Sequence, residues 1–336
     1  MVSEGRAVVN DPGRRRRQGW SVLTVSQARS FADRLMAAIE GKNSRLCVGL
    51  DPRVADLPEV VMRSDGLSVP TVEAVIRFCV LIMKAVAPYA VAVKLQAAFF
   101  EVLRVGGDMA YFALAEAASR LGLITIADVK RSDIGSTAEA YAQAYLGTPD
   151  APSPFDAVTV NIYLGLDGVR PFLETAQATG KGLFVLVRTS NPSAGEVQDL
   201  RLEDGRLVHE AMADLVRQWG AEMVGARGYS DVGAVVGATV PRHLELLRGR
   251  MPQQFFLVPG YGAQGAGPQD VVGAFDDQGF GAIVNSSRGI IYAYRQQPYA
   301  SRYAPEEFAA AAAEAARDTR DAINRALQDV GKLRLN

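Results

Sequence analysis

The sequence predicts an α/β protein built as a closed eight-stranded barrel, and three observations carry this prediction. Eight short apolar segments recur along the 336 residues, and amphipathic segments separate them. Strands that alternate with helices form parallel βαβ units with right-handed crossovers. Eight such units in a chain of this length favour closure into a (β/α)8, or TIM, barrel. An open doubly wound sheet is the second possibility, but Gly49-Leu50-Asp51-Pro52 stands where its Gly-x-Gly-x-x-Gly turn would be expected.

The expected strands are short apolar runs, each bounded by turn-forming or charged residues. In chain order they are Leu46–Leu50, Ala90–Val93, Leu123–Ala127, Ala157–Val160, Leu183–Val187, Gly233–Gly237, Phe255–Val258 and Ala282–Val284. The clearest amphipathic helices are Ser26–Ile39, Val72–Val86, Ala110–Leu121, Leu207–Trp219, Pro241–Arg248 and Pro305–Val330. Two connections are longer than the rest, Arg53–Pro70 and Thr189–Asp231, and both follow strand ends on the face where barrel enzymes place their active sites.

The domain organisation follows from composition. Residues 1–22 contain Arg14-Arg15-Arg16-Arg17 among Gly, Pro and Asp and have no apolar core, so they are not a secretory signal. We expect a disordered basic tail there, a polybasic interaction arm being the other interpretation, and a single barrel domain over residues 23–336. No apolar run approaches the roughly 18 residues that a membrane-spanning helix needs, so we expect no membrane association.

Charge and cysteine usage exclude several classes of function. Hydrophobic residues make up 49% of the chain and charged residues 22%, and the net charge of −1 gives no electrostatic case for a nucleic-acid partner. The two cysteines, Cys47 and Cys79, do not form a disulfide framework and fit a reducing cytoplasm. His209 and His243 both fall in helical surroundings without a Cys/His cluster, so we expect no metal site.

Charged residues stand at the ends of three predicted strands. Asp128 and Lys130 follow the apolar run that begins at Leu123, and they point the same way if the strand alternates regularly. Lys94 and Asp51 end two other apolar runs. Charges are costly to bury without partners, so these residues predict one site at the carboxyl end of the barrel. Unrelated salt bridges at strand ends are the alternative.

A phosphate site is predicted at the last two strand ends. The loop after the seventh strand contains Gly260, Gly262, Gln264 and Gly265, and Arg288 follows the eighth strand. Barrel loops at these positions often bind phosphate through backbone N–H groups and a helix N-terminus. Glycine permits close approach of the backbone, and arginine adds a rigid positive fork. A simple turn is the other interpretation of the glycines.

Taken together, these segments resemble the orotidine 5′-phosphate decarboxylases in their longer bacterial form. The resemblance spans roughly residues 31–294, and one departure is Ile162, where the long form usually has proline. The matching motifs are Gly49-Leu50-Asp51-Pro52, Val93-Lys94-Leu95-Gln96, Asp128-Val129-Lys130-Arg131-Ser132-Asp133-Ile134-Gly135, Thr159-Val160-Asn161, Thr189-Ser190-Asn191-Pro192, Pro259-Gly260-Tyr261-Gly262-Ala263-Gln264-Gly265 and Ser287-Arg288-Gly289.

The resemblance implies decarboxylation of orotidine 5′-monophosphate to UMP in de novo pyrimidine biosynthesis, without metal or other cofactor. It implies that Lys130 stabilises and protonates the C6 carbanion, with Asp128 beside the substrate carboxylate. Lys94 would hold Asp128 and a ribose hydroxyl, and Asp133 would complete a Lys-Asp-Lys-Asp array.

The resemblance also assigns substrate contacts and an oligomeric state. Asp51 would bind the ribose, Ser190 the pyrimidine edge, and Gln264 with Arg288 the phosphate. The remaining residues implied to contact substrate are Thr137, Asn161, Gly260 and Ser287. Asp133 and Thr137 would reach the neighbouring subunit's site, which makes the expected working unit a homodimer with shared active sites.

Two other functions stay open at this point. A magnesium-dependent sugar-phosphate decarboxylase on the same barrel would use Asp128 and Asp133 to hold the metal. The Ser190 and Gln264 loops, which suit a base and its phosphate, argue against it. A catalytically silent phosphate-binding barrel would need a broken charged array, and here all four members are present.

Overall fold

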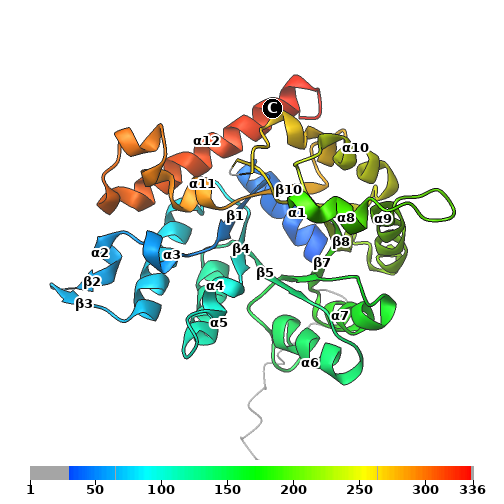
Figure 1. Ribbon diagram of the computed structural model, residues 1–336, viewed down its shortest axis with the longest axis horizontal. Helices are drawn as coiled ribbons and strands as arrows, with labels where there is room; N and C mark the ends of the chain where they lie inside the picture. Colours follow the sequence, from blue (N-terminus) through cyan, green and yellow to red (C-terminus); the bar gives the residue numbers. More distant parts are fainter. Residues whose placement is uncertain (1–29, 65, 263, 334–336) are drawn as a thin grey trace, which may run out of the picture.

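The computed structural model describes residues 30–64, 66–262 and 264–333, and it confirms the (β/α)8 barrel (Figure 1). All eight barrel strands are parallel, and they close in the order β1-β10-β9-β8-β7-β6-β5-β4. The strands are β1 (Leu46–Leu50), β4 (Ala92–Gln96), β5 (Ile124–Arg131), β6 (Ala157–Val160), β7 (Gly182–Arg188), β8 (Ser230–Val236), β9 (Gln254–Val258) and β10 (Ala282–Ser286). The predicted tail, residues 1–22, lies outside the described residues, and the domain boundary at residue 23 stays a prediction.

Helices surround these strands and bury their outer faces (Figure 1). They are α1 (Phe31–Lys42), α2 (Glu59–Met62), α3 (Thr71–Val86), α4 (Ala98–Glu101), α5 (Gly107–Arg120), α6 (Gly135–Leu146), α7 (Leu166–Thr179), α8 (Gly195–Gln198), α9 (Val208–Trp219), α10 (Pro241–Arg250), α11 (Arg288–Ile291) and α12 (Phe308–Asp329). Within the described residues, no helix is long and apolar enough to cross a membrane.

Helix α1 seals the amino-terminal end of the barrel. Its Phe31 ring lies edge-on to Phe184 of β7, with ring centroids 5.8 Å apart. Gly182 gives the ring room, because a Cβ atom there would lie 2.1 Å from the Phe31 side chain. Phe31 belongs to one buried cluster with residues that point into the barrel, such as Ile126 and Leu257. The lower barrel is therefore apolar and closed, and this leaves the carboxyl end for polar chemistry.

The strand register places polar residues in one layer above that apolar interior. On β4, Ala92 belongs to the interior cluster, whereas Lys94 and Gln96 line a cavity above it. Lys94 pairs in register with Ile126, and Gln96 pairs with Asp128 of β5. Side chains two residues apart share a face of a strand. The same alternation that fills the barrel with apolar side chains therefore brings charged ones to its mouth.

The structure corrects several predicted boundaries. Strand β8 begins at Ser230, so the second long connection ends earlier than the predicted Asp231. Asp231 is fixed in the strand because its Oδ1 accepts a hydrogen bond from the N–H of Ala32 at 2.7 Å. The first long connection holds α2 and a two-stranded hairpin, β2 (Arg63–Ser64) with β3 (Leu67–Ser68). The closing helix begins with a 3-10 turn, and α12 itself starts at Phe308.

Candidate active site

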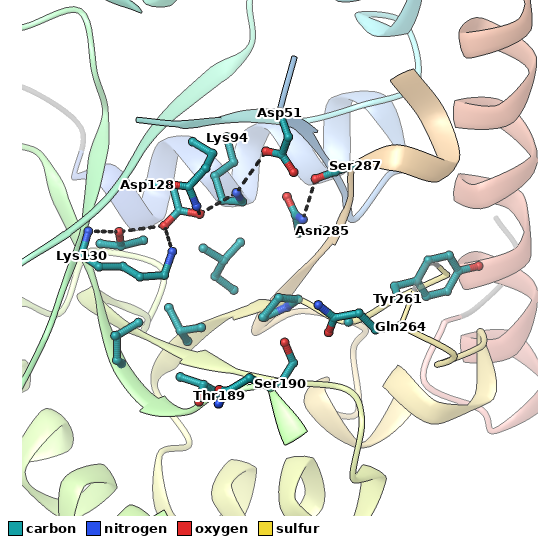
Figure 2. A pocket seen from close by; sticks show the side chains of 18 of the residues that line it. Asp51, Lys94, Asp128, Lys130, Thr189, Ser190, Tyr261, Gln264, Asn285 and Ser287 are labelled. Atoms are coloured by element: carbon teal, nitrogen blue, oxygen red, sulfur yellow. Dashed lines mark hydrogen bonds and ion pairs between the residues drawn. The ribbon is translucent and has the colours of Figure 1, made fainter. Parts of the chain in front are cut away.

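A cavity of about 390 Å3 opens at the carboxyl end of the barrel strands (Figure 2). Asp51, Lys94, Asp128 and Lys130 occupy one side, and residues of the loops after β7 and β9 line the opposite wall. Strands β7, β8 and β9 contribute the apolar side chains of Leu186, Val235 and Leu257 to the lining. The polar lining comes from Asp51, Lys94, Gln96, Asp128, Lys130, Thr159, Thr189, Ser190, Asn191, Gln264, Asn285, Ser287 and Arg288.

Asp128 is the centre of the charged side. Its Oδ2 lies 2.6 Å from Lys94 Nζ and accepts a second hydrogen bond from Gln96 Nε2 at 3.1 Å. Its Oδ1 forms an ion pair with Lys130 Nζ. Lys94 Nζ also lies 4.0 Å from Asp51 Oδ1. The sequence prediction that these strand-end charges converge on one site is therefore supported by their geometry.

The ionisation of this cluster follows from burial and pairing. Burial alone would raise the pKa of Asp128, but the charges of Lys94 and Lys130 and their hydrogen bonds hold that pKa well below its usual range. Burial alone would lower the pKa of Lys94, but Asp128 and then Asp51 raise that pKa above its usual value. Lys94 and Asp128 therefore both stay charged at neutral pH. Lys130 differs from Lys94 in access, because 43% of its side chain is exposed and only 7% of the Lys94 side chain.

Lys130 reaches Asp128 through an irregular strand. Its backbone φ is +47°, a left-handed conformation that is uncommon for a residue with a side chain. The β5–β6 register shifts between Ala127 and Arg131, so the segment bulges. Thr159 Oγ1 of β6 accepts hydrogen bonds from the N–H groups of Val129 at 2.9 Å and Lys130 at 3.0 Å. A neighbouring strand therefore supplies the partner that stabilises the bulge.

Two oxygens on the β1 and β10 side lack hydrogen-bond partners among the described residues. Both Asp51 Oδ1 and Asn285 Oδ1 are buried and accept no hydrogen bond. Buried acceptors without partners are costly, so a bound polar ligand is the natural donor for them. Ser287 lies beside Asn285, whose Nδ2 is 3.4 Å from Ser287 Oγ. Gly49 makes room for that hydroxyl, because a Cβ atom there would lie 1.8 Å from Ser287 Oγ.

Hydrogen bonds that Gln198 and Arg188 form with Thr189 hold the loop that carries Ser190. Gln198 Oε1 accepts a hydrogen bond from the N–H of Thr189 at 2.9 Å, and Gln198 Nε2 donates to Thr189 Oγ1 at 2.9 Å. Arg188, buried at the end of β7, donates to the Thr189 carbonyl at 3.0 Å. Gly237 lets the loop pass, since a Cβ atom there would lie within 3.0 Å of Ser190. Ser190 is therefore fixed on the cavity wall opposite Lys94 and Asp128.

The predicted phosphate end is formed by the loop after β9 and the start of α11. Gly260, Gly262 and Gly265 all have positive φ, so the loop backbone needs glycine at these positions. Gln264 extends from this loop toward the wall that carries Ser190 (Figure 2). Arg288 is exposed at the cavity rim, and its guanidinium forms no ion pair with any of the described residues. An arginine and a glycine-rich backbone at one rim suit an anionic group.

Three predicted site residues lie away from this cavity. Asp133 follows β5, and its Oδ1 accepts a hydrogen bond from the N–H of Ile134 at 2.9 Å. Thr137 is exposed in the first turn of α6. Asn161 uses its Oδ1 to accept a hydrogen bond from the N–H of Tyr163 at 3.0 Å. None of the three lines the cavity of its own chain. Their substrate contacts stay predictions.

Sequence reasoning assigned no role to Gln96, Thr159 or Asn285, although all three line the cavity. Gln96 lies two residues past Lys94 on the same strand face, and this spacing could have identified it. Asn285 precedes Ser287 by two residues in the same way. Thr159 gives no such signal, because its importance depends on contact with β5.

The fold and site define a class of protein, namely (β/α)8-barrel enzymes that combine a buried charged array with a loop suited to an anion. Comparison with known proteins is more specific. Residues 44–303 match the orotidine 5′-phosphate decarboxylase / HUMPS family. The chain therefore belongs to this family.

Curated relatives and solved structures agree with that membership. The chain is 46% identical to an orotidine 5′-phosphate decarboxylase of Rhodopirellula baltica, over 80% of this chain and 91% of the relative. It is 40% identical to that of Deinococcus radiodurans, over 89% and 98%. A crystal structure of a putative orotidine 5′-phosphate decarboxylase from Streptomyces avermitilis aligns with a TM-score of 0.72 and 34% identity, covering 91% of this chain and 98% of that one. A 2.75 Å structure of the corresponding putative enzyme from Toxoplasma gondii gives a TM-score of 0.75 and 33% identity, over 90% and 99%.

Proposed function

We propose that this protein is a carboxy-lyase that converts orotidine 5′-monophosphate to UMP and carbon dioxide. The observation that carries the proposal is the Lys94–Asp128–Lys130 cluster at the mouth of a barrel whose relatives are named for this reaction. In the reaction the bond between C6 and the carboxylate breaks, and its electron pair stays on C6. A proton from the Lys130 ammonium then forms the new C6–H bond. Atoms and electrons balance in these two steps without a cofactor.

The arrangement suits this chemistry electrostatically. The developing carbanion needs a positive group fixed before the bond breaks. Lys130 is partly exposed to the cavity and is held by Asp128, so its ammonium is oriented toward the space where substrate would lie. Lys94 is buried behind Asp128 and keeps that carboxylate ionised. Asp128 would then lie beside the substrate carboxylate.

The rest of the cavity fits the remaining parts of the nucleotide. Asp51 Oδ1 and Asn285 Oδ1 accept no hydrogen bond from the described residues and would accept from ribose hydroxyls. Ser190 would read the pyrimidine edge, and Gln264 with Arg288 would bind the phosphate; all three side chains line the cavity. Binding energy from a phosphate remote from C6 can favour the transition state by closing loops over the site.

We infer that the working unit is a homodimer with shared sites. Asp133 and Thr137 lie outside their own cavity, beside strand β5, where they could reach a partner's site. The connections that follow β4, β5 and β6, in the same sector of the barrel, also carry exposed apolar side chains, and exposed apolar groups in one region are typical of protein interfaces. These residues are Val102, Val105, Met109, Ile134, Tyr163 and Leu164.

We also propose a cytoplasmic location. Cys47 and Cys79 are both buried and unpaired, and they fit a reducing compartment.

A direct assay tests the proposed reaction. Purified protein in excess chelator should consume orotidine 5′-monophosphate, followed by its absorbance, and should form UMP in equal amount. Failure to turn over this nucleotide would overturn the proposal. Turnover of a sugar phosphate that depends on added Mg2+ would instead favour the related metal-dependent activity.

A further inference from the structure

We propose that Asp199, His209 and His243 form a binding site for a divalent transition-metal ion, remote from the reacting carbon. Each residue offers one possible ligand atom, and the three atoms lie within 4.8 Å of one another. The residues come from different places in the chain, since Asp199 follows α8, His209 begins α9 and His243 lies in α10. Helix α9 packs against both α8 and α10 at the side of the barrel (Figure 1).

Each of these residues has a buried polar atom that lacks a hydrogen-bond partner among the described residues. The atoms are Asp199 Oδ1, His209 Nε2 and His243 Nδ1. His209 is completely buried and His243 is 7% exposed. A buried polar atom without a partner is costly, and three in one cluster point to a shared ligand. Two imidazole nitrogens and a carboxylate oxygen are ligands that Zn2+ prefers.

The tautomer of His209 can be argued from its contacts. Its Nδ1 lies 2.8 Å from the Gln198 carbonyl oxygen, which can only accept a hydrogen bond. The proton then sits on Nδ1, and Nε2 keeps a lone pair for a metal. Metal-binding histidines generally hold their second nitrogen through such a contact. The ring centroids of His209 and His243 are 4.9 Å apart.

In this arrangement the Asp199 carboxylate would bind both the Arg188 guanidinium and the metal ion. Asp199 Oδ2 lies 3.0 Å from Arg188 Nη2, whereas Oδ1, which accepts no hydrogen bond from the described residues, lies 3.2 Å from His209 Nδ1 and would bind the metal. Arg188 weakens the attraction for an ion, so the affinity should be lower than that of a closed cysteine site. Tetrahedral zinc at about 2.0–2.1 Å from each ligand would place the ligand atoms about 3.3 Å apart, so small side-chain rotations would complete the site. Asp199 is partly exposed, with 36% of its side chain accessible, which gives the ion a route and leaves room for a water ligand.

The position of the site indicates a structural role. Gln198, adjacent to Asp199, holds the Thr189–Ser190 loop of the candidate active site through three hydrogen bonds with Thr189 and Arg188. A metal at Asp199, His209 and His243 would join this segment to α9 and α10. The ion would then fix the segment at Gln198, which in turn holds the Thr189–Ser190 loop in the cavity wall.

The test uses full-length protein without a histidine tag, stripped with chelator and titrated with Zn2+ by calorimetry. Wild type should bind one Zn2+ per chain. Asp199→Asn and His243→Gln should each weaken binding by at least about tenfold. The matched control is Asp214→Asn on the same helix α9, where the carboxylate pairs with Arg206 and Arg250 instead. This control should bind like wild type, and Zn2+ should raise its melting temperature but not that of Asp199→Asn.

X-ray absorption on the Zn2+-loaded wild type keeps the proposal testable if a variant fails to fold. The chain contains two histidines in total, so a spectrum with two imidazole ligands would assign both. Absence of Zn2+ binding by wild type, or a spectrum without imidazole, would overturn the proposal. Equal binding by wild type, Asp199→Asn and His243→Gln would overturn it as well.

Discussion

The Thr159 hydroxyl on β6 accepts a hydrogen bond from the backbone N–H of Lys130 on β5, at 3.0 Å. The same oxygen accepts from the N–H of Val129 at 2.9 Å and donates to Asp128 Oδ1 at 3.1 Å. A hydroxyl has one proton and two lone pairs, so Thr159 uses its whole capacity on this segment. One side chain therefore stabilises the bulge at Lys130 and orients the carboxylate that holds the lysine ammonium.

Replacing Thr159 with valine should lower kcat/KM by roughly tenfold to a hundredfold. Valine keeps the shape but leaves the N–H groups of Val129 and Lys130 without this partner; a loss of roughly 1–3 kcal/mol in transition-state stabilisation corresponds to this change. Steady-state kinetics with orotidine 5′-monophosphate measures the effect. Thr159→Ser retains the hydroxyl and should stay within a few fold of wild type. Wild-type kinetics in Thr159→Val would show that the bulge does not depend on this hydroxyl.

Lys130→Ala should reduce turnover by many orders of magnitude while the protein stays folded. The variant removes both the cation beside C6 and the proton donor. Single-turnover kinetics and circular dichroism together check the prediction. Lys84→Ala, at an exposed position of α3, is the control and should be fully active. Near-normal turnover in Lys130→Ala would exclude it as the proton donor.

Arg288→Ala should reduce kcat/KM by an amount equivalent to roughly 2–4 kcal/mol, if loop closure desolvates the phosphate. Added phosphite dianion should partly restore the activity of wild type toward a substrate truncated at the phosphate. Arg295→Ala is the control, because Arg295 lies nearby in the chain and pairs with Asp56 outside the cavity. An unchanged kcat/KM in Arg288→Ala would mean that the phosphate binds elsewhere.

Mixed dimers of Lys130→Ala and Asp133→Ala should recover activity. If Asp133 serves the partner's site, a mixed dimer has one site with both lesions and one site with neither. Half of the dimers are mixed after exchange, so activity should approach about a quarter of wild type per total site, by this counting and the shared-site geometry of symmetric dimers. The measurement is the activity per total site after Lys130→Ala and Asp133→Ala protein have been mixed and allowed to exchange subunits.

The control for subunit exchange is a mixture of wild type with Lys130→Ala, followed by native mass spectrometry to show mixed dimers. If mixed dimers form and remain inactive, Asp133 acts within its own chain or merely complements the amino terminus of α6.

Asp231 should make the protein less stable as pH rises. Burial raises the pKa of Asp231 to about 6, whereas the unfolded carboxyl titrates near 3.9. Its contribution to the free energy of unfolding is therefore full below about pH 4 and is lost as pH rises through about 6. Asp231→Asn should gain roughly 1–2 kcal/mol relative to wild type between pH 5 and pH 8. Urea unfolding measures this, with the exposed Asp277→Asn as control. An equal pH dependence in wild type and Asp231→Asn would contradict it.

Much of the fold could be predicted because its signals are local. Short apolar runs and their spacing predicted all eight strands, and the strand ends were displaced by a few residues where tertiary contacts decide. Strand β8 begins three residues before the predicted Gly233 because the backbone of Ser230 pairs with β9 next to Gln254. Strand β5 continues to Arg131 because β6 pairs with it beyond the predicted end. Contacts between distant segments leave no trace in local periodicity.

The candidate site was predictable where motif and strand position coincide. Asp51, Lys94, Asp128 and Lys130 do converge, yet the regular alternation used to place Lys130 beside Asp128 does not hold. A positive φ and a register shift intervene. The convergence depends instead on Thr159, whose hydroxyl lies 29 residues away along the chain.

The sequence by itself determined the strand order, the apolar filling of the barrel and the charges at its mouth, because hydrophobic burial and side-chain alternation depend on neighbouring residues. The tertiary structure decided which polar groups meet. His209 and His243 look isolated along the chain, but the packing of α9 against α10 brings them to Asp199. Asp51 and Asn285, at the ends of the paired strands β1 and β10, each carry a buried oxygen that accepts no hydrogen bond from the described residues. Closure brings residues distant in sequence into one low-dielectric space, and there each polar atom needs a partner.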